Sequence, residues 1–106
     1  GLSTHTKAQA LEAELLPVDY IGIGPVYETT SKVSEWPVVG TTMIRWVRRT
    51  ASLPIVAIGG ITLARIVDCV AAGADNVAII GDLMSSPDIE ERTRQMCEAY
   101  RRAAED

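Results

Sequence analysis

The sequence predicts an α/β fold in which parallel strands alternate with helices. Three short apolar runs, at residues 20–24, 55–60 and 77–81, each end in glycine and lack the polar alternation of a half-exposed strand. Such runs are typical of strands that are buried on both faces, as in a parallel sheet covered by helices. Helical patterns separate the runs, which indicates right-handed βαβ units.

The first helix is expected to follow the tail of a strand. Residues 1–6 (GLSTHT) resemble the end of a strand and its loop, with most of the strand cut away. Thr6 followed by Gln9 resembles a capping box, which satisfies the first backbone N–H groups of a helix. The apolar face of this helix is expected to contain Ala8, Leu11, Leu15 and Leu16.

Three further helices have recognisable start signals. Thr42, Thr62 and Ser86 are each expected to cap a helix, with Pro87 at the first position of the last one. Gly73 is expected to end the middle helix, because glycine accepts the left-handed conformation found there. The apolar faces are expected to contain Met43, Val47 and Trp46 in the first, Ile66, Val67 and Val70 in the second, and Ile89, Thr93, Met96, Cys97 and Tyr100 in the third.

One connection is longer than the others. From Pro25 to Gly40 the chain has no clear periodicity and exceeds the roughly 2–6 residues of a usual βα link. Its position after the carboxyl end of a strand favours a functional loop. We interpret residues 1–106 as a single partial domain of four βα units, the first lacking most of its strand, which makes the C-terminal half of a (β/α)8 TIM barrel. A doubly wound sheet would instead need a topological switch point.

Composition and charge argue against several classes of function and partner. The 106 residues carry 14 acidic and 10 basic side chains, a formal net charge of -4 that argues against a nucleic-acid partner. The basic group Arg45, Arg48 and Arg49 is expected to be a solvated helix face. No apolar stretch approaches the ~20 residues of a membrane span and no signal peptide is recognisable, so a cytoplasmic protein is expected. Cys69 and Cys97 lack metal-ligand spacing and are expected to be buried free thiols.

Two glycine-containing turns are candidates for phosphate binding. Segments 59–62 (GGIT) and 80–82 (IGD) each join a strand to a helix. Glycine lets an anion approach the backbone, and barrel loops after the last two strands commonly bind phosphate. The alternative is that these glycines only permit tight turns. Asp82 is expected to orient a neighbouring N–H or to cap the turn before Pro87.

The other two loops carry polar side chains. Segment 29–32 (TTSK) places three hydroxyl groups beside an ammonium group, a combination that binds phosphate or pyrophosphate and stabilises a leaving group. Ser3 and His5 follow the first strand on the same side. No acid is placed to orient His5, so a hydrolase triad is not expected and a structural histidine is the alternative. Asp19 and Asp75 precede strands and are expected at the opposite, stability-related end.

Five segments form an ordered set along nearly the whole chain. They are 3–6 (STHT), 19–27 (DYIGIGPVY), 29–32 (TTSK), 57–61 (AIGGI) and 72–75 (AGAD). The set resembles thiamine-phosphate synthase, and STHT together with TTSK makes the resemblance specific. It implies a transferase of thiamine biosynthesis that couples hydroxymethylpyrimidine diphosphate to thiazole phosphate. The products would be thiamine phosphate and pyrophosphate.

The resemblance also implies roles by position. Ser3 and Lys32, as the catalytic residues, would contact the pyrimidine diphosphate and stabilise the departing pyrophosphate. The residues that would bind the thiazole phosphate are Thr29, Thr30 and Ser31 on the loop and Gly60, Ile80 and Gly81 through their backbone. The full-length family is expected to use Mg2+. A Gln-x-Arg-x-Lys segment, an Asn-Asp pair and a further Asp that bind the pyrimidine diphosphate and Mg2+ are absent here, so the isolated chain is expected to lack synthase activity.

Two other functions stay open at this point. A thiazole tautomerase-like enzyme would use His5 as its acid and base. A non-catalytic phosphate-binding half-barrel would self-associate to cover its open sheet edges.

Overall fold

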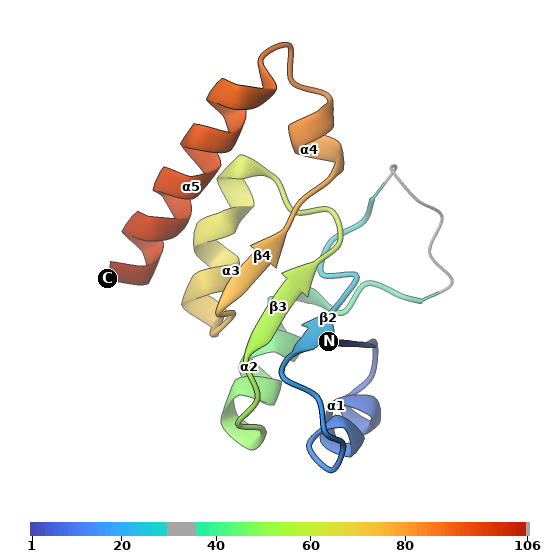
Figure 1. Cartoon of the computed structure of the whole chain (residues 1–106). Coiled ribbons are helices and arrows are strands. Elements are labelled where there is room, and N and C mark those ends of the chain that lie inside the picture. The colour runs from blue at the N-terminus through green and yellow to red at the C-terminus, as the bar shows by residue number, and fades with distance from the viewer. Residues whose placement is uncertain (30–35, 106) are drawn as a thin grey trace.

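Four parallel strands form a single sheet in the computed structural model, which describes residues 1–29 and 36–105 (Figure 1). The strands are β1 (Leu2–Thr4), β2 (Ile21–Ile23), β3 (Ile55–Ile58) and β4 (Asn76–Ala78). They lie in the order β1-β2-β3-β4, and each pairs in parallel with the next. The three predicted strands are confirmed, and the N-terminal segment contributes a fourth.

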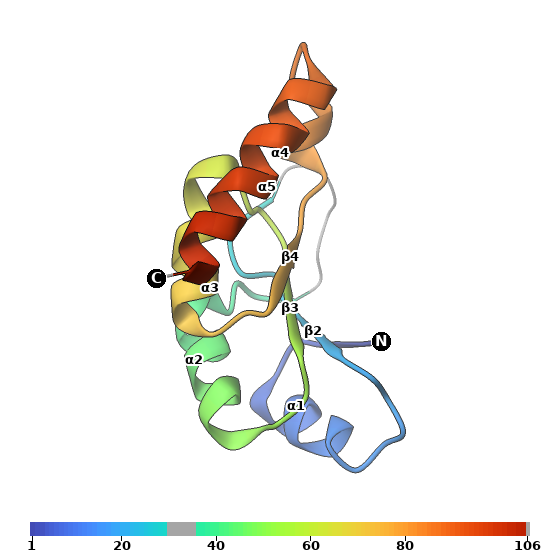
Figure 2. The same ribbon diagram turned by 60° about the vertical axis from the view of Figure 1, so that its left-hand side comes forward.

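A helix or helical turn follows every strand. The helices are α1 (Lys7–Ala13), α2 (Gly40–Thr50), the 3-10 turn η1 (Leu63–Arg65), α3 (Ile66–Ala72), α4 (Gly81–Met84) and α5 (Ile89–Glu105). Helix α4 was not predicted, because four residues are too few to show a periodic pattern. Figure 2 shows α2, α3 and α5 on one side of the sheet. This arrangement confirms the α/β fold of four βα units and is that of half a (β/α)8 barrel.

The hydrophobic core lies between the sheet and the helices. Ile21 and Ile55 are completely buried on this side, as are Ile44 of α2 and Ile66 of α3. Fully buried aliphatic side chains contribute the main stabilising term of such a layer, about 1.5–3 kcal/mol each. The core therefore fixes the sheet against its helices and leaves the loops at the strand ends to carry other roles.

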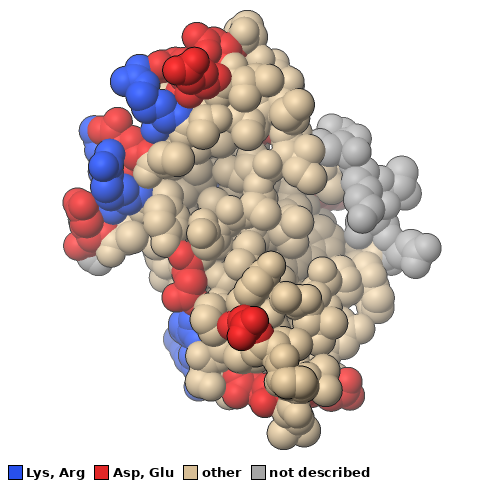
Figure 3. Space-filling model, viewed as in Figure 1, with Lys and Arg blue, Asp and Glu red and all other residues tan. Residues whose placement is uncertain are grey.

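The opposite face of the sheet is open in the described structure. Ser3, Gly22, Val56 and Asn76 form one row across this face, because the parallel register aligns them. Ile58, on the same face of β3, is 40% exposed. Figure 3 shows few charged side chains over the strands here. The prediction of strands buried on both faces is therefore wrong for this face, since the helices of the described residues cover the other one.

The first helix buries different residues from those expected. Thr6 caps it as predicted, and its Oγ1 accepts the N–H of Gln9 at 3.1 Å. The buried residues of α1 are Ala10 and Ala13, whereas Ala8 is exposed and Leu11, Leu15 and Leu16 are 46%, 87% and 49% exposed. The expected leucine face is wrong because the helix ends at Ala13, one turn early, and packs on β1 and α2 through its alanine side.

The starts of α2 and α3 also differ from the prediction. Helix α2 begins at Gly40, so Thr42 lies inside its first turn, where its hydroxyl donates to the carbonyl of Val39 at 3.5 Å. Thr62 precedes η1 without a side-chain cap hydrogen bond. Gly73 ends α3 as predicted, with a φ of 118°. The expected burial of Val67 is wrong, since it is 49% exposed and Cys69 is buried instead.

Helix α5 is capped by an acid. The Asp88 carboxylate accepts the N–H of Glu91 at 3.0 Å, whereas the Ser86 hydroxyl accepts the N–H of Asp88 at 3.3 Å. Met96 is buried as expected, whereas Ile89 and Thr93 of the same predicted face are exposed. The expected burial of Cys97 is wrong, because one residue turns the side chain by about 100° around the helix, away from the core.

Candidate functional site

The carboxyl ends of the four strands meet at one edge of the sheet (Figure 1). In a parallel barrel this edge carries the loops that bind substrates. The described residues that were predicted for the site lie on β1 or on segments that leave this edge: Ser3, His5, Thr29, Gly60, Ile80 and Gly81. Thr30, Ser31 and Lys32 lie outside the described residues.

The turn after β3 interlocks with the loop after β2. Gly59 and Gly60 have φ values of 105° and 65°, a region that favours glycine. A Cβ on Gly60 would lie 2.3 Å from the carbonyl oxygen of Glu28. The carbonyl of Gly59 accepts the N–H of Tyr27 at 3.0 Å. These glycines are therefore needed for the close approach of the two loops, which supports the tight-turn alternative for at least part of their role.

Arg65 adds a positive charge beside this turn. Its Nη1 donates to the carbonyl of Gly60 at 2.8 Å, and its guanidinium carbon lies 4.4 Å from the centre of the Tyr27 ring. Burial, followed by the neighbouring Cys69 thiol, raises the pKa of the Tyr27 hydroxyl. The sequence prediction missed Arg65. A basic residue five positions after Gly60, in a segment already expected to bind an anion, was the available signal.

Asp82 connects the segments that follow β3 and β4. Its Oδ2 accepts the N–H of Leu63 at 2.8 Å and pairs with Nη1 of Arg92 at 3.1 Å. The Arg92 and Asp82 side chains are 29% and 22% exposed, so water screens the pair less than a fully exposed one. The predicted orientation of a neighbouring N–H by Asp82 is confirmed, and its carboxylate contacts η1 and α5.

His5 is held between the backbone and an aromatic ring. Its Nδ1 lies 2.8 Å from the carbonyl oxygen of Gly24, which can only accept, so Nδ1 is the donor. Its ring stacks on Trp36, with centroids 4.5 Å apart and planes at 7°. Ser3 is exposed on the open face of the sheet. A carbonyl, and not a carboxylate, orients His5, which favours its structural role over a hydrolase triad.

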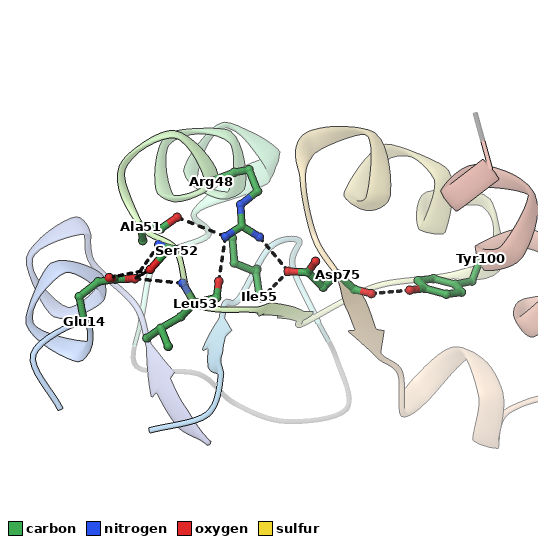
Figure 4. Close-up of polar contacts among 8 residues, drawn as sticks. All are labelled: Glu14, Arg48, Ala51, Ser52, Leu53, Ile55, Asp75 and Tyr100. Carbon is green, nitrogen blue, oxygen red and sulfur yellow. Dashed lines mark hydrogen bonds and ion pairs between the residues drawn. The ribbon is translucent and has the colours of Figure 1, made fainter. Parts of the chain in front are cut away.

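A second polar cluster lies at the opposite end of the strands (Figure 4). Arg48 Nη1 and Asp75 Oδ2 are 2.8 Å apart, and the same oxygen accepts the N–H of Ile55 at 2.8 Å. Arg48 Nη2 also donates to the carbonyls of Ala51 and Leu53 at 3.2 and 2.9 Å. The expected position of Asp75 at the stability-related end is confirmed. The expectation of a solvated helix face is wrong for Arg48, because its side chain binds the segment between α2 and β3 and the segment between α3 and β4.

Glu14 and Tyr100 extend this cluster to α1 and α5. Glu14 Oε1 accepts the N–H groups of Leu53 and Ser52 at 3.0 and 2.7 Å, and these bonds hold the pKa of Glu14 below its ordinary value. The Tyr100 hydroxyl donates to the carbonyl of Asp75 at 2.5 Å. The cluster therefore joins helices and strands well away from the glycine turns.

Comparisons with known proteins assign the family. The sequence profile described as thiamine monophosphate synthase matches residues 1–83. The chain belongs to the thiamine monophosphate synthase family. Thiamine-phosphate synthase of Methanospirillum hungatei is 43% identical over 98 residues, which cover 92% of this chain and 48% of the relative. That of Methanocella arvoryzae is 45% identical over 96 residues, which cover 91% and 45%.

Solved structures agree with this family. Thiamine phosphate pyrophosphorylase from Pyrococcus furiosus superposes with a TM-score of 0.86 at 29% identity, covering 95% of this chain and 48% of that one. The chain thus spans about half the length of the thiamine-phosphate synthases that it matches. The resemblance and the enzyme family predicted from the sequence are confirmed. The roles assigned to single residues stay predictions.

Two further findings concern the described part of this family member. Within residues 1–29 and 36–105, no three His, Cys, Asp or Glu side chains group together in a way that could hold a metal ion. No helix in the same ranges is both long and apolar enough to cross a membrane.

Proposed function

We propose that the chain supplies the thiazole-phosphate and leaving-group side of a thiamine-phosphate synthase active site. One observation carries this proposal: Ser3, Gly60 and Gly81 gather near the carboxyl edge of one sheet in a chain 43% identical to a thiamine-phosphate synthase. The reaction would couple hydroxymethylpyrimidine diphosphate to thiazole phosphate. Its products would be thiamine phosphate and pyrophosphate.

In this proposal the thiazole phosphate binds to the backbone of the two glycine turns. Gly60, Ile80 and Gly81 supply N–H groups, which bind phosphate oxygens closely where no side chain intervenes. Arg65, bonded to the carbonyl of Gly60, adds positive charge at the turn. The hydroxyl groups on the loop after β2 belong to Thr29, Thr30 and Ser31 and complete this side of the site.

Ser3 and Lys32 are proposed to act on the leaving group. Negative charge grows on the pyrophosphate oxygen as its bond to the pyrimidine methylene carbon breaks. A hydroxyl group and an ammonium group beside this oxygen would stabilise that charge as it develops. Mg2+ would neutralise the diphosphate in the full-length family, but the described residues do not fit a metal site. The metal therefore has no assigned ligands here, and we expect no synthase activity from the chain alone.

The test uses a protein that joins this chain to the remaining half of the family's length. Lys32→Ala is expected to lower kcat by about 100-fold or more, the scale of losing one donor to a developing oxyanion. Arg45→Ala removes the same charge from an exposed position on α2 and should leave kcat within about twofold. Equal effects of the two substitutions would overturn the role of Lys32.

A separate assay addresses the incomplete site. The chain alone, given both substrates and Mg2+, is expected to form no thiamine phosphate. Product formation would show that the reaction does not need the Gln-x-Arg-x-Lys segment and the acidic residues that this sequence lacks.

Three further predictions concern His5, self-association and the cellular compartment. The tautomerase alternative gains no support from His5, whose Nδ1 is committed to Gly24 and whose ring is stacked on Trp36. Self-association through the open sheet edges stays a prediction, which measurement of the oligomeric state would test. Small phosphorylated metabolites as substrates make the cytoplasm the expected compartment.

A further inference from the structure

We infer that Asp82 is a positioning residue, which sets the distance between the two glycine turns so that both can bind the same phosphate group. The inference rests on the proposed function. Its starting point is one carboxylate oxygen with two partners: Oδ2 of Asp82 binds the N–H of Leu63 and Nη1 of Arg92. Three elements, η1, α4 and α5, thus meet at a single atom.

The connection lies beyond the part of the sheet that the strand pairing holds. The last paired residues of β3 and β4 are Ile58 and Ala78. After these residues, the segment that follows each strand leaves the sheet through its own glycine turn. The hydrogen bond between Leu63 and Asp82 spans 19 positions and ties the two segments together after the turns. Leu63 comes soon after Gly60, and Asp82 comes directly after Gly81. Their hydrogen bond therefore constrains the backbone that presents the N–H groups of the two glycines.

Charge explains why an acid is compatible with this place. A bare carboxylate near a phosphate site would repel the anion. Here the charge of Asp82 is paired with Arg92, which is 29% exposed and comes from α5 behind the turns. The oxygen is also occupied by a backbone N–H, so the carboxylate acts on the protein and not on the ligand. Its effect on phosphate binding is therefore expected to be indirect and favourable.

The chain contains a matched control for this arrangement. Asp75 precedes β4 as Asp82 follows it, and its Oδ2 also accepts one backbone N–H, that of Ile55, and one Arg nitrogen, that of Arg48. The two acids thus make the same kind of contact at opposite ends of the same two strands. Asp75 belongs to the end away from the glycine turns, so its loss should affect stability without affecting phosphate affinity.

The experiment titrates the chain with thiazole phosphate and follows the amide NMR signals of Gly60 and Gly81. In the unsubstituted chain both signals are expected to move with one dissociation constant. Asp82→Ala should weaken binding about tenfold, the equivalent of one lost charge-assisted hydrogen bond, and speed hydrogen exchange at Leu63. Asp75→Ala should leave the affinity within about twofold. Asp82→Asn keeps an acceptor for Leu63 and should restore part of the affinity.

The outcomes separate two failures. Suppose that the unsubstituted chain binds thiazole phosphate and that Asp82→Ala and Asp82→Asn bind it as tightly as the unsubstituted chain does. If the amide of Leu63 nevertheless exchanges faster in these variants, the positioning role is wrong. Equal losses of affinity in Asp82→Ala and Asp75→Ala would reduce Asp82 to a general stabilising residue and also overturn the inference. If the unsubstituted chain itself does not bind thiazole phosphate, the proposed phosphate site fails, and the positioning role fails with it.

Discussion

Arg48 and Asp75 form an ion pair at the amino-terminal end of the sheet, with Nη1 and Oδ2 2.8 Å apart. The counterpart at the other end is the pair of Arg92 and Asp82, at 3.1 Å. Each acid also accepts a backbone N–H, Asp75 from Ile55 at the start of β3 and Asp82 from Leu63 in η1, the element that follows β3. The start of β3 and the element that follows it are thereby each bound to an acid that flanks β4, and each acid is paired with an arginine from a helix.

Arg48→Ala is expected to lower the free energy of unfolding by about 1–3 kcal/mol, because Asp75 and two backbone carbonyls lose a donor together. Urea unfolding followed by circular dichroism measures this change. Arg49→Ala, at an exposed position of the same helix, should stay within about 0.5 kcal/mol of the unsubstituted chain. Equal losses of stability in the two variants would mean that the hydrogen bonds and the ion pair of Arg48 contribute nothing beyond its positive charge.

Glu14→Gln is expected to lower the free energy of unfolding at neutral pH and to make that free energy fall less steeply as the pH is lowered. Backbone N–H groups lower the pKa of Glu14 in the folded chain, so the unfolded chain binds this proton first. The stabilising contribution is complete above the ordinary value of 4.5 and disappears as the pH falls through the lower folded pKa. Unfolding curves at a series of pH values should therefore converge for the two proteins in acid. Glu12→Gln, at an exposed position of α1 two residues earlier, is the control and should change the stability little.

Gly60→Ala should destabilise the chain more than Gly40→Ala. Both glycines have left-handed backbone, with φ of 65° and 71°, so each substitution has a conformational cost of about 1–2 kcal/mol. At Gly60 the new Cβ would also lie 2.3 Å from the carbonyl oxygen of Glu28, whereas at Gly40 the nearest atom, on Thr42, is 3.6 Å away. Thermal unfolding of the two variants isolates the cost of the clash. Indistinguishable melting temperatures would contradict the close contact between the loops.

The two cysteines should differ sharply in reactivity. Cys97 is exposed on α5, whereas Cys69 is completely buried and burial raises its pKa, which lowers the fraction of reactive thiolate. Ellman's reagent is expected to modify one thiol per native chain and two after unfolding. Cys97→Ser should abolish the native reaction, and persistence of that reaction would place Cys69 within reach of solvent.

The elements were predictable where local signals determine them. The runs ending in glycine mark β2, β3 and β4, and Thr6 and Gly73 mark helix ends, because each depends on neighbours within a few residues. The cap at Thr42 was wrong because the left-handed Gly40 turns the chain into α2 two residues earlier. A local signal can thus be overridden by another one close by.

The site was predictable in outline, as a gathering of loops at one edge, since parallel strands impose it. The partners of Asp82 and Arg48 were not, because Leu63, Arg92 and Asp75 lie 10 to 27 positions away and only the packing of helices on the sheet brings them near. The prediction for the leucines of the first helix was wrong because α1 ends at Ala13, so Leu15 and Leu16 lie beyond it, and the helix packs through Ala10 and Ala13.

Gly22 offers a way to measure the depth of the space beside Ser3. Unlike Gly60, it has no left-handed backbone, and a Cβ there would lie 3.7 Å from the Cα and 3.9 Å from the Oγ of Ser3, an ordinary contact distance. Neither the backbone nor the packing of the described residues demands glycine at this position. Successively larger side chains at residue 22 would therefore fill the space beside Ser3 on the open face in steps, while the fold beneath it stays the same. The largest side chain that is accepted would measure the depth of that space.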